Sequence, residues 1–311
     1  MITSRTVSSL EKIFHDSEPT CASLSEMSML GNERASFQLA YFSDEDTHCG
    51  ISVSGWNPEN MKIYKVVEIN SDMPAYEDSD FYFLRKAPGL YPDMLEPVED
   101  GTFLVEKGHY GSIWIELDAS GESAGKHDLF VTVSKGKETV TNVITVDVIP
   151  AKLPAQELMC TMWFHCDCLA TYYKVDVFSE EHWRIIENYV KNAAAHGINF
   201  ILTPLFTPPL DTEVGGERPT VQLVDVKKTK DGYEFGFDRL DRWIDMCKRC
   251  GIKYFEMSHL FTQWGAEHAP KIIAEVDGEE KRIFSYCVYR QKGYKKLLPL
   301  PCFRRAVARA V

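Results

Sequence analysis

The apolar residues between positions 158 and 264 follow one pattern twice. In each copy an apolar strand leads through a loop into a helix, and a glycine after the helix precedes a new apolar run. The first helix is expected to begin at Ser179 and end at His196-Gly197, and the second to run from Asp238 to Cys250-Gly251. A glycine followed by β-branched and aromatic residues is typical of a helix end and a strand start. The pattern predicts strand–helix–strand units that build a parallel sheet.

The first half of the chain instead alternates apolar and polar residues, which is typical of strands with one buried face. Such segments lie at 37–42, 111–117, 129–133 and 140–148. They predict an antiparallel β-sandwich over residues 1–150, followed by a stiff Pro-rich linker. Residues 1–30 are expected to form a loose lead-in, and residues 72–101 an extended loop.

Residues 155–284 contain three predicted strands and two crossover helices. An eightfold β/α barrel typically needs about 250 residues, so this region is either a small open sheet or a barrel cut short. Two hairpins, around Lys230-Asp231-Gly232 and Asp277-Gly278, are expected as inserts in its loops.

Composition narrows the possible partners and the compartment. The net charge of −12 argues against nucleic acid and anionic membranes as partners. No run approaches the ~20 apolar residues of a membrane span, and the amino terminus lacks a signal-peptide core. Nine cysteines in no small-scaffold spacing suit a reducing compartment, so we expect a cytoplasmic protein.

The charge distribution changes after Phe284. Residues 285–311 carry seven of the 34 basic residues of the chain and none of its 46 acidic residues. This atypical basic tail is either an ordinary basic, anion-binding arm or a stretch whose sequence is foreign to the protein encoded by residues 1–284.

Candidate binding residues follow the three predicted strands, because ligands collect beyond the carboxyl ends of parallel strands. A His and a carboxylate after the first strand could bind a sugar hydroxyl, a metal or each other. An indole beside amide and hydroxyl groups after the third strand suits sugar recognition. A buried His satisfied by a carbonyl, a rigid loop and a space-filling Trp are the structural alternatives. The candidate substrate-binding residues are His165, Asp167, Asp211, His259, Gln263 and Trp264.

Two other chemistries have weaker support. His165, Asp167 and His259 could form a metal triad, which keeps a metal-dependent enzyme as a rival hypothesis. The C-x-x-C motif Cys247-Lys248-Arg249-Cys250 has no second pair and falls on a helix, so core packing is favoured. Glycosidases need two placed carboxyl groups, and no strand end in 155–284 supplies them. The catalytic residues are therefore unassigned.

Several sequence strings occur in an order that carries a family resemblance. They are 32–41, Tyr91-Pro92-Asp93, Ala124-Gly125, 163–168, 259–266 and 269–272. On these residues the chain resembles the glycoside hydrolase family 123 relatives grouped under domain of unknown function 4091. The resemblance covers residues 25–284. It implies a β-sandwich followed by a (β/α)8 barrel, of which 155–284 would be the N-terminal part. The expected fold class is thus α/β plus all-β, with an incomplete (β/α)8 (TIM-type) barrel.

The resemblance also implies an activity, namely hydrolysis of glycans with β-linked N-acetylhexosamine of the N-acetylgalactosamine type. In that substrate-assisted mechanism the acetamide oxygen attacks the anomeric carbon, an Asp orients the acetamide, and the adjacent Glu protonates the leaving oxygen. No metal or organic cofactor is implied, and the implied partner is the glycan substrate.

The resemblance breaks off where the charge changes. The Asp-Glu pair of the family lies beyond position 284 and has no counterpart here. We therefore expect a truncated or frameshifted member whose coding sequence departs near Phe284. A non-catalytic carbohydrate-binding protein is the alternative function. Nothing in the pattern specifies the linkage or an oligomeric state.

Overall fold

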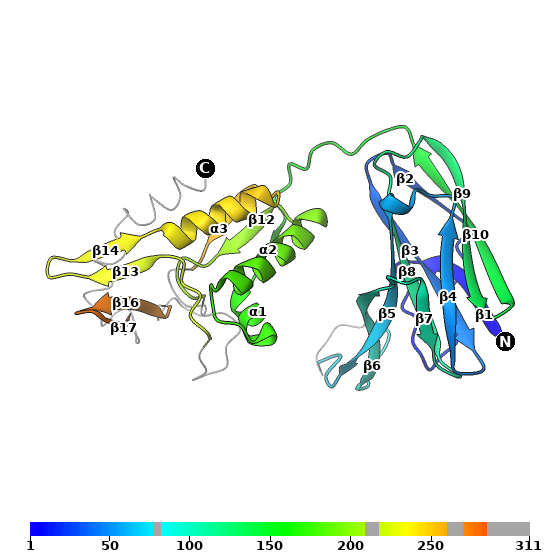
Figure 1. Cartoon of the computed structure of the whole chain (residues 1–311), viewed down its shortest axis with the longest axis horizontal. Helices are drawn as coiled ribbons and strands as arrows, with labels where there is room; N and C mark the ends of the chain where they lie inside the picture. Colours follow the sequence, from blue (N-terminus) through cyan, green and yellow to red (C-terminus); the bar gives the residue numbers. More distant parts are fainter. Residues whose placement is uncertain (77–81, 209–217, 260–269, 285–311) are drawn as a thin grey trace. The chain divides into compact units, whose positions relative to one another are not determined.

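The computed structural model describes residues 1–76, 82–208, 218–259 and 270–284 (Figure 1). The chain divides into two compact units, Met1–Ala155 and Gln156–Val311. In the described ranges, no helix is both long and apolar enough to cross a membrane.

The first unit consists of two five-stranded sheets, ordered β1-β3-β8-β5-β6 and β2-β10-β9-β4-β7. Neighbouring strands pair antiparallel except β2 and β10, which run parallel. A short 3₁₀ turn at Pro58–Asn60 precedes β5. The strands are β1 Ile2–Ser8, β2 Glu26–Leu30, β3 Arg34–Ser43, β4 Thr47–Ser54, β5 Met61–Ser71, β6 Gly89–Pro97, β7 Thr102–Val105, β8 Tyr110–Asp118, β9 Gly125–Lys135 and β10 Glu138–Ile149.

One hydrophobic core joins the two sheets of this unit. Phe37 and Leu39 of β3 and Val131 of β9 are fully buried in it. They alternate with outward-facing residues because successive side chains of a strand point to opposite faces. Each such side chain contributes about 1.5–3 kcal/mol by leaving water.

Two segments of the first unit differ from the sequence-based expectation. The expected loose lead-in over residues 1–30 is wrong, because β1 pairs with β3 along its whole length and Ile2 and Val7 are buried. The loop expected over 72–101 contains β6, which pairs with β5 through a register shift at Val67/Glu68. Both strands are edge strands, each held by one neighbouring strand alone, so local alternation gave little signal.

Within residues 156–208, 218–259 and 270–284, the second unit forms two separate sheets (Figure 1). One is a parallel three-stranded sheet, ordered β11-β12-β15. The other has the order β14-β13-β16-β17 and joins the two inserted hairpins. The elements are β11 Thr161–Met162, α1 Cys166–Tyr173, α2 Glu180–Ala195, β12 Phe200–Thr203, β13 Asp225–Lys228, β14 Tyr233–Gly236, α3 Asp238–Arg249, β15 Tyr254–Met257, β16 Ile272–Val276 and β17 Glu279–Phe284.

Helix α2 begins where the sequence predicts. Ser179 is its N-cap, and the Ser179 hydroxyl accepts a hydrogen bond from the His182 amide at 3.2 Å. Trp183, Ile186 and Val190 form the buried face of the helix at i, i+3 and i+7.

Helix α3 lies beside α2, next to the parallel sheet (Figure 1). Leu240, Trp243 and Cys247 are fully buried in the core that both helices share. Burial raises the pKa of the Cys247 thiol, so this cysteine is an inert core residue, as the sequence predicts.

The expected fold class is wrong for the second unit. In the described ranges its all-parallel sheet has three strands of two to four residues and stays open, and no (β/α)8 barrel is formed. The hairpins expected as separate loop inserts pair with each other through Lys227↔Glu275 and Lys228↔Val276. A barrel closes through a continuous ring of strands, whereas these hairpin strands belong to a second sheet.

Candidate functional site

The carboxyl ends of β11 and β15 bring Trp163, Glu256 and His259 together; we call these three residues the Trp163 cluster. The Trp163 indole Nε1 donates to the two Glu256 carboxylate oxygens at 3.3 and 3.2 Å. The His259 ring lies edge-on to the Trp163 ring, with centroids 5.4 Å apart.

The strand register explains why the cluster forms. Met162 pairs with Ile201, and Leu202 pairs with Glu256, so Trp163, one residue after Met162, is level with Glu256 on the same face of the sheet. The Thr161 hydroxyl also donates to Glu256, at 3.4 Å. The Trp163 side chain is 41% exposed, which leaves part of its indole face accessible to a ligand.

His259 contributes an unused polar atom to this cluster. Its Nδ1 is buried and meets no hydrogen-bond partner among the described residues. Leaving such an atom unpaired costs about 1–3 kcal/mol, so a hydroxyl or amide of a ligand would gain by pairing with it.

Asp167 is engaged by an arginine that lies 51 residues further along the chain. The Arg218 guanidinium donates to both carboxylate oxygens of Asp167, from Nε at 2.7 Å and from Nη2 at 3.0 Å. The Asp167 side chain is 5% exposed and the Arg218 side chain 11%, so the ion pair is buried. This bidentate geometry ties the first turn of α1 to the segment before β13.

His165 lies immediately before α1, at the N-cap position, with no side-chain capping bond. The start of α1 is held by a histidine that the sequence did not single out. His182 is fully buried, accepts from the Phe178 amide through Nδ1 at 2.9 Å and donates from Nε2 to the Cys166 carbonyl at 2.9 Å. Burial lowers the pKa of His182, which keeps this ring neutral.

Buried hydroxyl groups hold the loops at the ends of β12 and β15. The Ser258 amide donates to the Thr203 carbonyl at 2.9 Å, and the Ser258 hydroxyl donates to the Phe206 carbonyl at 3.3 Å. The Thr207 hydroxyl accepts from the Val221 amide at 3.1 Å. These bonds make the strand ends a fixed platform for the Trp163 cluster.

The structure thus brings one predicted residue, His259, against Trp163 and pairs another, Asp167, with Arg218. Asp211, Gln263 and Trp264 lie outside the described residues. Sequence reasoning missed Glu256, because a single Glu inside an apolar strand resembles any edge residue, and missed Arg218, because no local motif marks it. Among the described residues, no group of three or more His, Cys, Asp or Glu side chains could hold a metal ion.

Comparisons with known proteins relate part of this chain to one family of enzymes. The sequence model of the glycoside hydrolase 123 catalytic domain matches residues 163–301, a range that includes the Trp163 cluster and Asp167. Its match continues past Phe284, so it does not end where the charge changes. No curated protein sequence matches the chain.

A solved structure of a family 123 glycoside hydrolase from Clostridium perfringens, described for glycolipid glycan hydrolysis, is similar to the chain with a TM-score of 0.71 and 16% identity. The similarity covers 92% of this chain and 53% of that one, so this chain spans about half the length of that relative. A FixG-related protein from Vibrio parahaemolyticus aligns with a TM-score of 0.25 and 8% identity over 47% of this chain and 95% of its own, which is too low for any inference.

The catalytic-domain match relates residues 163–301 to the glycoside hydrolases. More specifically, this part of the chain matches glycoside hydrolase family 123, which confirms the resemblance found in the sequence.

Proposed function

We propose that the second unit binds glycans that contain β-linked N-acetylhexosamine, of the N-acetylgalactosamine type. The observation that carries this proposal is the match of the family 123 catalytic domain over residues 163–301. The relative from Clostridium perfringens, described for glycolipid glycan hydrolysis, supports a glycan as the ligand.

The Trp163 cluster has the groups that such a ligand needs. The exposed part of the Trp163 indole offers a flat apolar surface for the C–H groups of a sugar ring. Glu256 and the buried Nδ1 of His259 are beside it to pair with hydroxyl or acetamide groups. His165, Asp167, Asp211, Gln263 and Trp264 complete the proposed sugar pocket.

Hydrolysis in this family is expected to be substrate-assisted, with an Asp that orients the acetamide and an adjacent Glu that protonates the leaving oxygen. The one Asp-Glu dipeptide in the 311-residue sequence is Asp44-Glu45. It lies in the first unit, where Asp44 pairs with the terminal amine of Met1, and Glu45 pairs with Lys135, on the surface. We therefore propose that this chain lacks the catalytic Asp-Glu pair. The absence of such a pair in the second unit's sequence also favours the alternative function, carbohydrate binding without turnover.

The first experiment separates turnover from binding. The full chain is assayed with a chromogenic N-acetyl-β-D-galactosaminide, and binding of N-acetylgalactosamine is measured by calorimetric titration. We expect saturable binding without release of the chromophore. Turnover would contradict the absence of the catalytic pair, and failure to bind would contradict the proposed substrate class.

Variants then locate the binding site. Trp163→Ala and His259→Ala should each weaken binding about tenfold, which corresponds to about 1.4 kcal/mol. Tyr172→Ala is the matched aromatic control, because Tyr172 is 77% exposed on α1 and contacts no member of the Trp163 cluster in the described ranges. Equal affinities of all three variants and the parent chain would place the sugar elsewhere.

A further inference from the structure

The first unit contains a cavity of about 240 Å³ that the hydrolase function does not use. Its walls come from the segment after β1, from β3, β5 and β8, and from the turn between β7 and β8. The polar side chains in these walls are His15, Tyr41, Lys65, Glu68, Glu106, His109, Tyr110 and Ser112.

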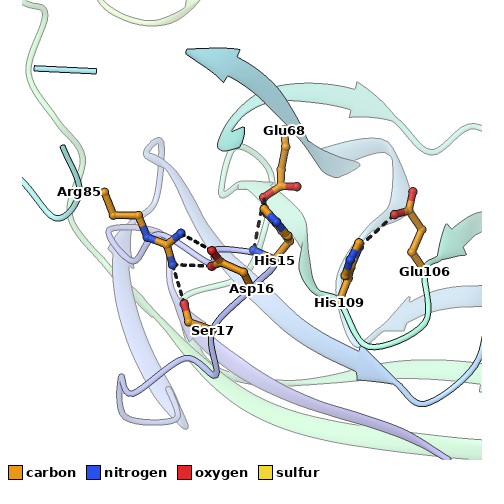
Figure 2. Close-up of polar contacts among 7 residues, drawn as sticks. All are labelled: His15, Asp16, Ser17, Glu68, Arg85, Glu106 and His109. Atoms are coloured by element: carbon orange, nitrogen blue, oxygen red, sulfur yellow. Dashed lines mark hydrogen bonds and ion pairs between the residues drawn. The ribbon is translucent and has the colours of Figure 1, made fainter. Parts of the chain in front are cut away.

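Two imidazole–carboxylate pairs face each other in this cavity (Figure 2). His15 Nδ1 lies 2.8 Å from Glu68 Oε1, and His109 Nδ1 lies 3.0 Å from Glu106 Oε2. The two rings are edge to face, with centroids 5.2 Å apart. Each carboxylate accepts a hydrogen bond from Nδ1–H, so in a neutral ring the Nε2 atom keeps its lone pair and can accept a hydrogen bond.

The segment that carries His15 is fixed on the sheet. Ile13 is 3% exposed in a small apolar cluster, and the His15 carbonyl accepts from the Tyr110 amide at 3.0 Å. The His15 amide in turn donates to Glu68 at 3.3 Å. Both main-chain groups of His15 are therefore bound, which holds its ring in place.

A second anchor lies one residue further on. The Arg85 guanidinium donates to both Asp16 oxygens at 2.9 and 2.6 Å and to the Ser17 hydroxyl at 2.7 Å (Figure 2). The guanidinium also lies over the Phe14 ring, 3.7 Å from its centroid. The cavity wall is thus organised before any ligand arrives, which reduces the entropy lost on binding.

Tyr41 and Gly111 set the opposite wall. A Cβ atom on Gly111 would lie 2.5 Å from the Tyr41 hydroxyl oxygen, so only glycine leaves room for this phenol. Burial raises the pKa of Tyr41, and the phenol remains a neutral group that can donate and accept a hydrogen bond.

The charges of the cavity determine the kind of ligand. Its lining combines one basic amine, Lys65, with the carboxyl groups of Glu68 and Glu106. The two carboxylates would repel an anion, and the lysine would repel a cation. A neutral molecule with several hydroxyl groups can instead pair with both the donors and the acceptors of the cavity. The volume equals that of about eight water molecules at ~30 Å³ each, which suits one sugar ring.

We propose that this cavity binds a single neutral sugar ring through the two imidazole–carboxylate pairs. The cavity lies wholly within the first unit, so this site is independent of the strand-end site in the second unit. It would give the protein a second point of attachment to a glycan.

The test is an NMR titration of the full chain with isotopically labelled histidine. His15→Asn and His109→Asn assign the two ring signals. Galactose and N-acetylgalactosamine are added as neutral sugars, and galactosamine, galacturonate and inorganic phosphate as charged probes. We expect saturable shifts of both ring signals with the neutral sugars, at a dissociation constant on the order of 1 mM.

Two variants make the result specific. Glu106→Ala, at a residue whose side chain is 61% exposed, should weaken the response about tenfold without affecting the fold. His127→Asn, on β9 outside the cavity lining, should leave it unchanged. Shifts with phosphate but not with sugars, a response restricted to histidines of the second unit, or an unchanged response in Glu106→Ala would each overturn the proposal.

Discussion

Removal of the Arg218 side chain should destabilise the second unit more than removal of any exposed arginine. In Arg218→Met the Asp167 carboxylate would stay buried without its guanidinium partner. Breaking a buried ion pair in this way typically costs about 3–5 kcal/mol, and the slight exposure of Arg218 places this case near ~3 kcal/mol. With a urea m-value of about 2 kcal/mol/M, the unfolding midpoint should fall by roughly 1.5 M.

The assay is urea unfolding followed through the amide signals of α1 and α2, which reports on the second unit separately from the first. Asp167→Asn combined with Arg218→Met should recover most of the loss, because no buried charge remains without a partner. Arg184→Met is the matched control, since Arg184 pairs with Glu181 on the surface and its loss should leave the midpoint unchanged. A midpoint shift in Arg218→Met no larger than in this control would refute the reasoning, as would a double variant no more stable than the single one.

Three further changes test local features of both units. Ser179→Ala removes the N-cap of α2 and should cost about 1 kcal/mol in the same urea experiment; an unchanged midpoint would contradict the capping role. Gly111→Ala places a Cβ 2.5 Å from the Tyr41 hydroxyl oxygen and should lower the free energy of unfolding of the first unit by about 1–3 kcal/mol. Thermal unfolding measures this loss, and an unchanged melting temperature would contradict the clash. The Tyr173 hydroxyl, 3.0 Å away, raises the pKa of Tyr189 to about 12, so Tyr173→Phe should return it toward ~10 in a spectrophotometric titration. Because folding raises the pKa of Tyr189, the protonated phenol stabilises the fold fully below about pH 10, and this contribution is lost as the pH rises through about 12. An unchanged titration of Tyr189 in Tyr173→Phe would exclude the hydrogen bond.

Features encoded within a few neighbouring residues could be predicted from the sequence. Ser179 marks the start of α2, and Gly197, with φ +90°, follows its end in the left-handed conformation that glycine tolerates. The turn at Lys230-Asp231-Gly232 likewise joins two antiparallel strands, β13 and β14. In each case the physical cause, a cap or a positive φ, is a property of one or two residues.

Features that depend on distant pairing could not be predicted in the same way. The contact of β13 with β16 involves two residue pairs, Lys227↔Glu275 and Lys228↔Val276, and neither strand carries a local sign of its partner. The repeated β/α pattern allowed either a small open sheet or a barrel cut short. The family resemblance implied the barrel, which the described residues do not form.

The same distinction applies to the candidate site. His259 was accessible to sequence reasoning because polar residues at strand ends mark binding positions in parallel sheets. Its neighbour Glu256 lies within a strand, and only the register with Leu202 brings it beside Trp163. Asp211, Gln263 and Trp264 stay predictions.

The pairing of β13 with β16 also has an evolutionary consequence. Two insertions, separated in the chain by α3 and β15, share one ladder of main-chain hydrogen bonds. Deleting either insertion would leave the other with a bare strand edge, open to pairing with a foreign chain. The two hairpins should therefore be kept or lost together during evolution, so that homologous genes encode both of them or neither.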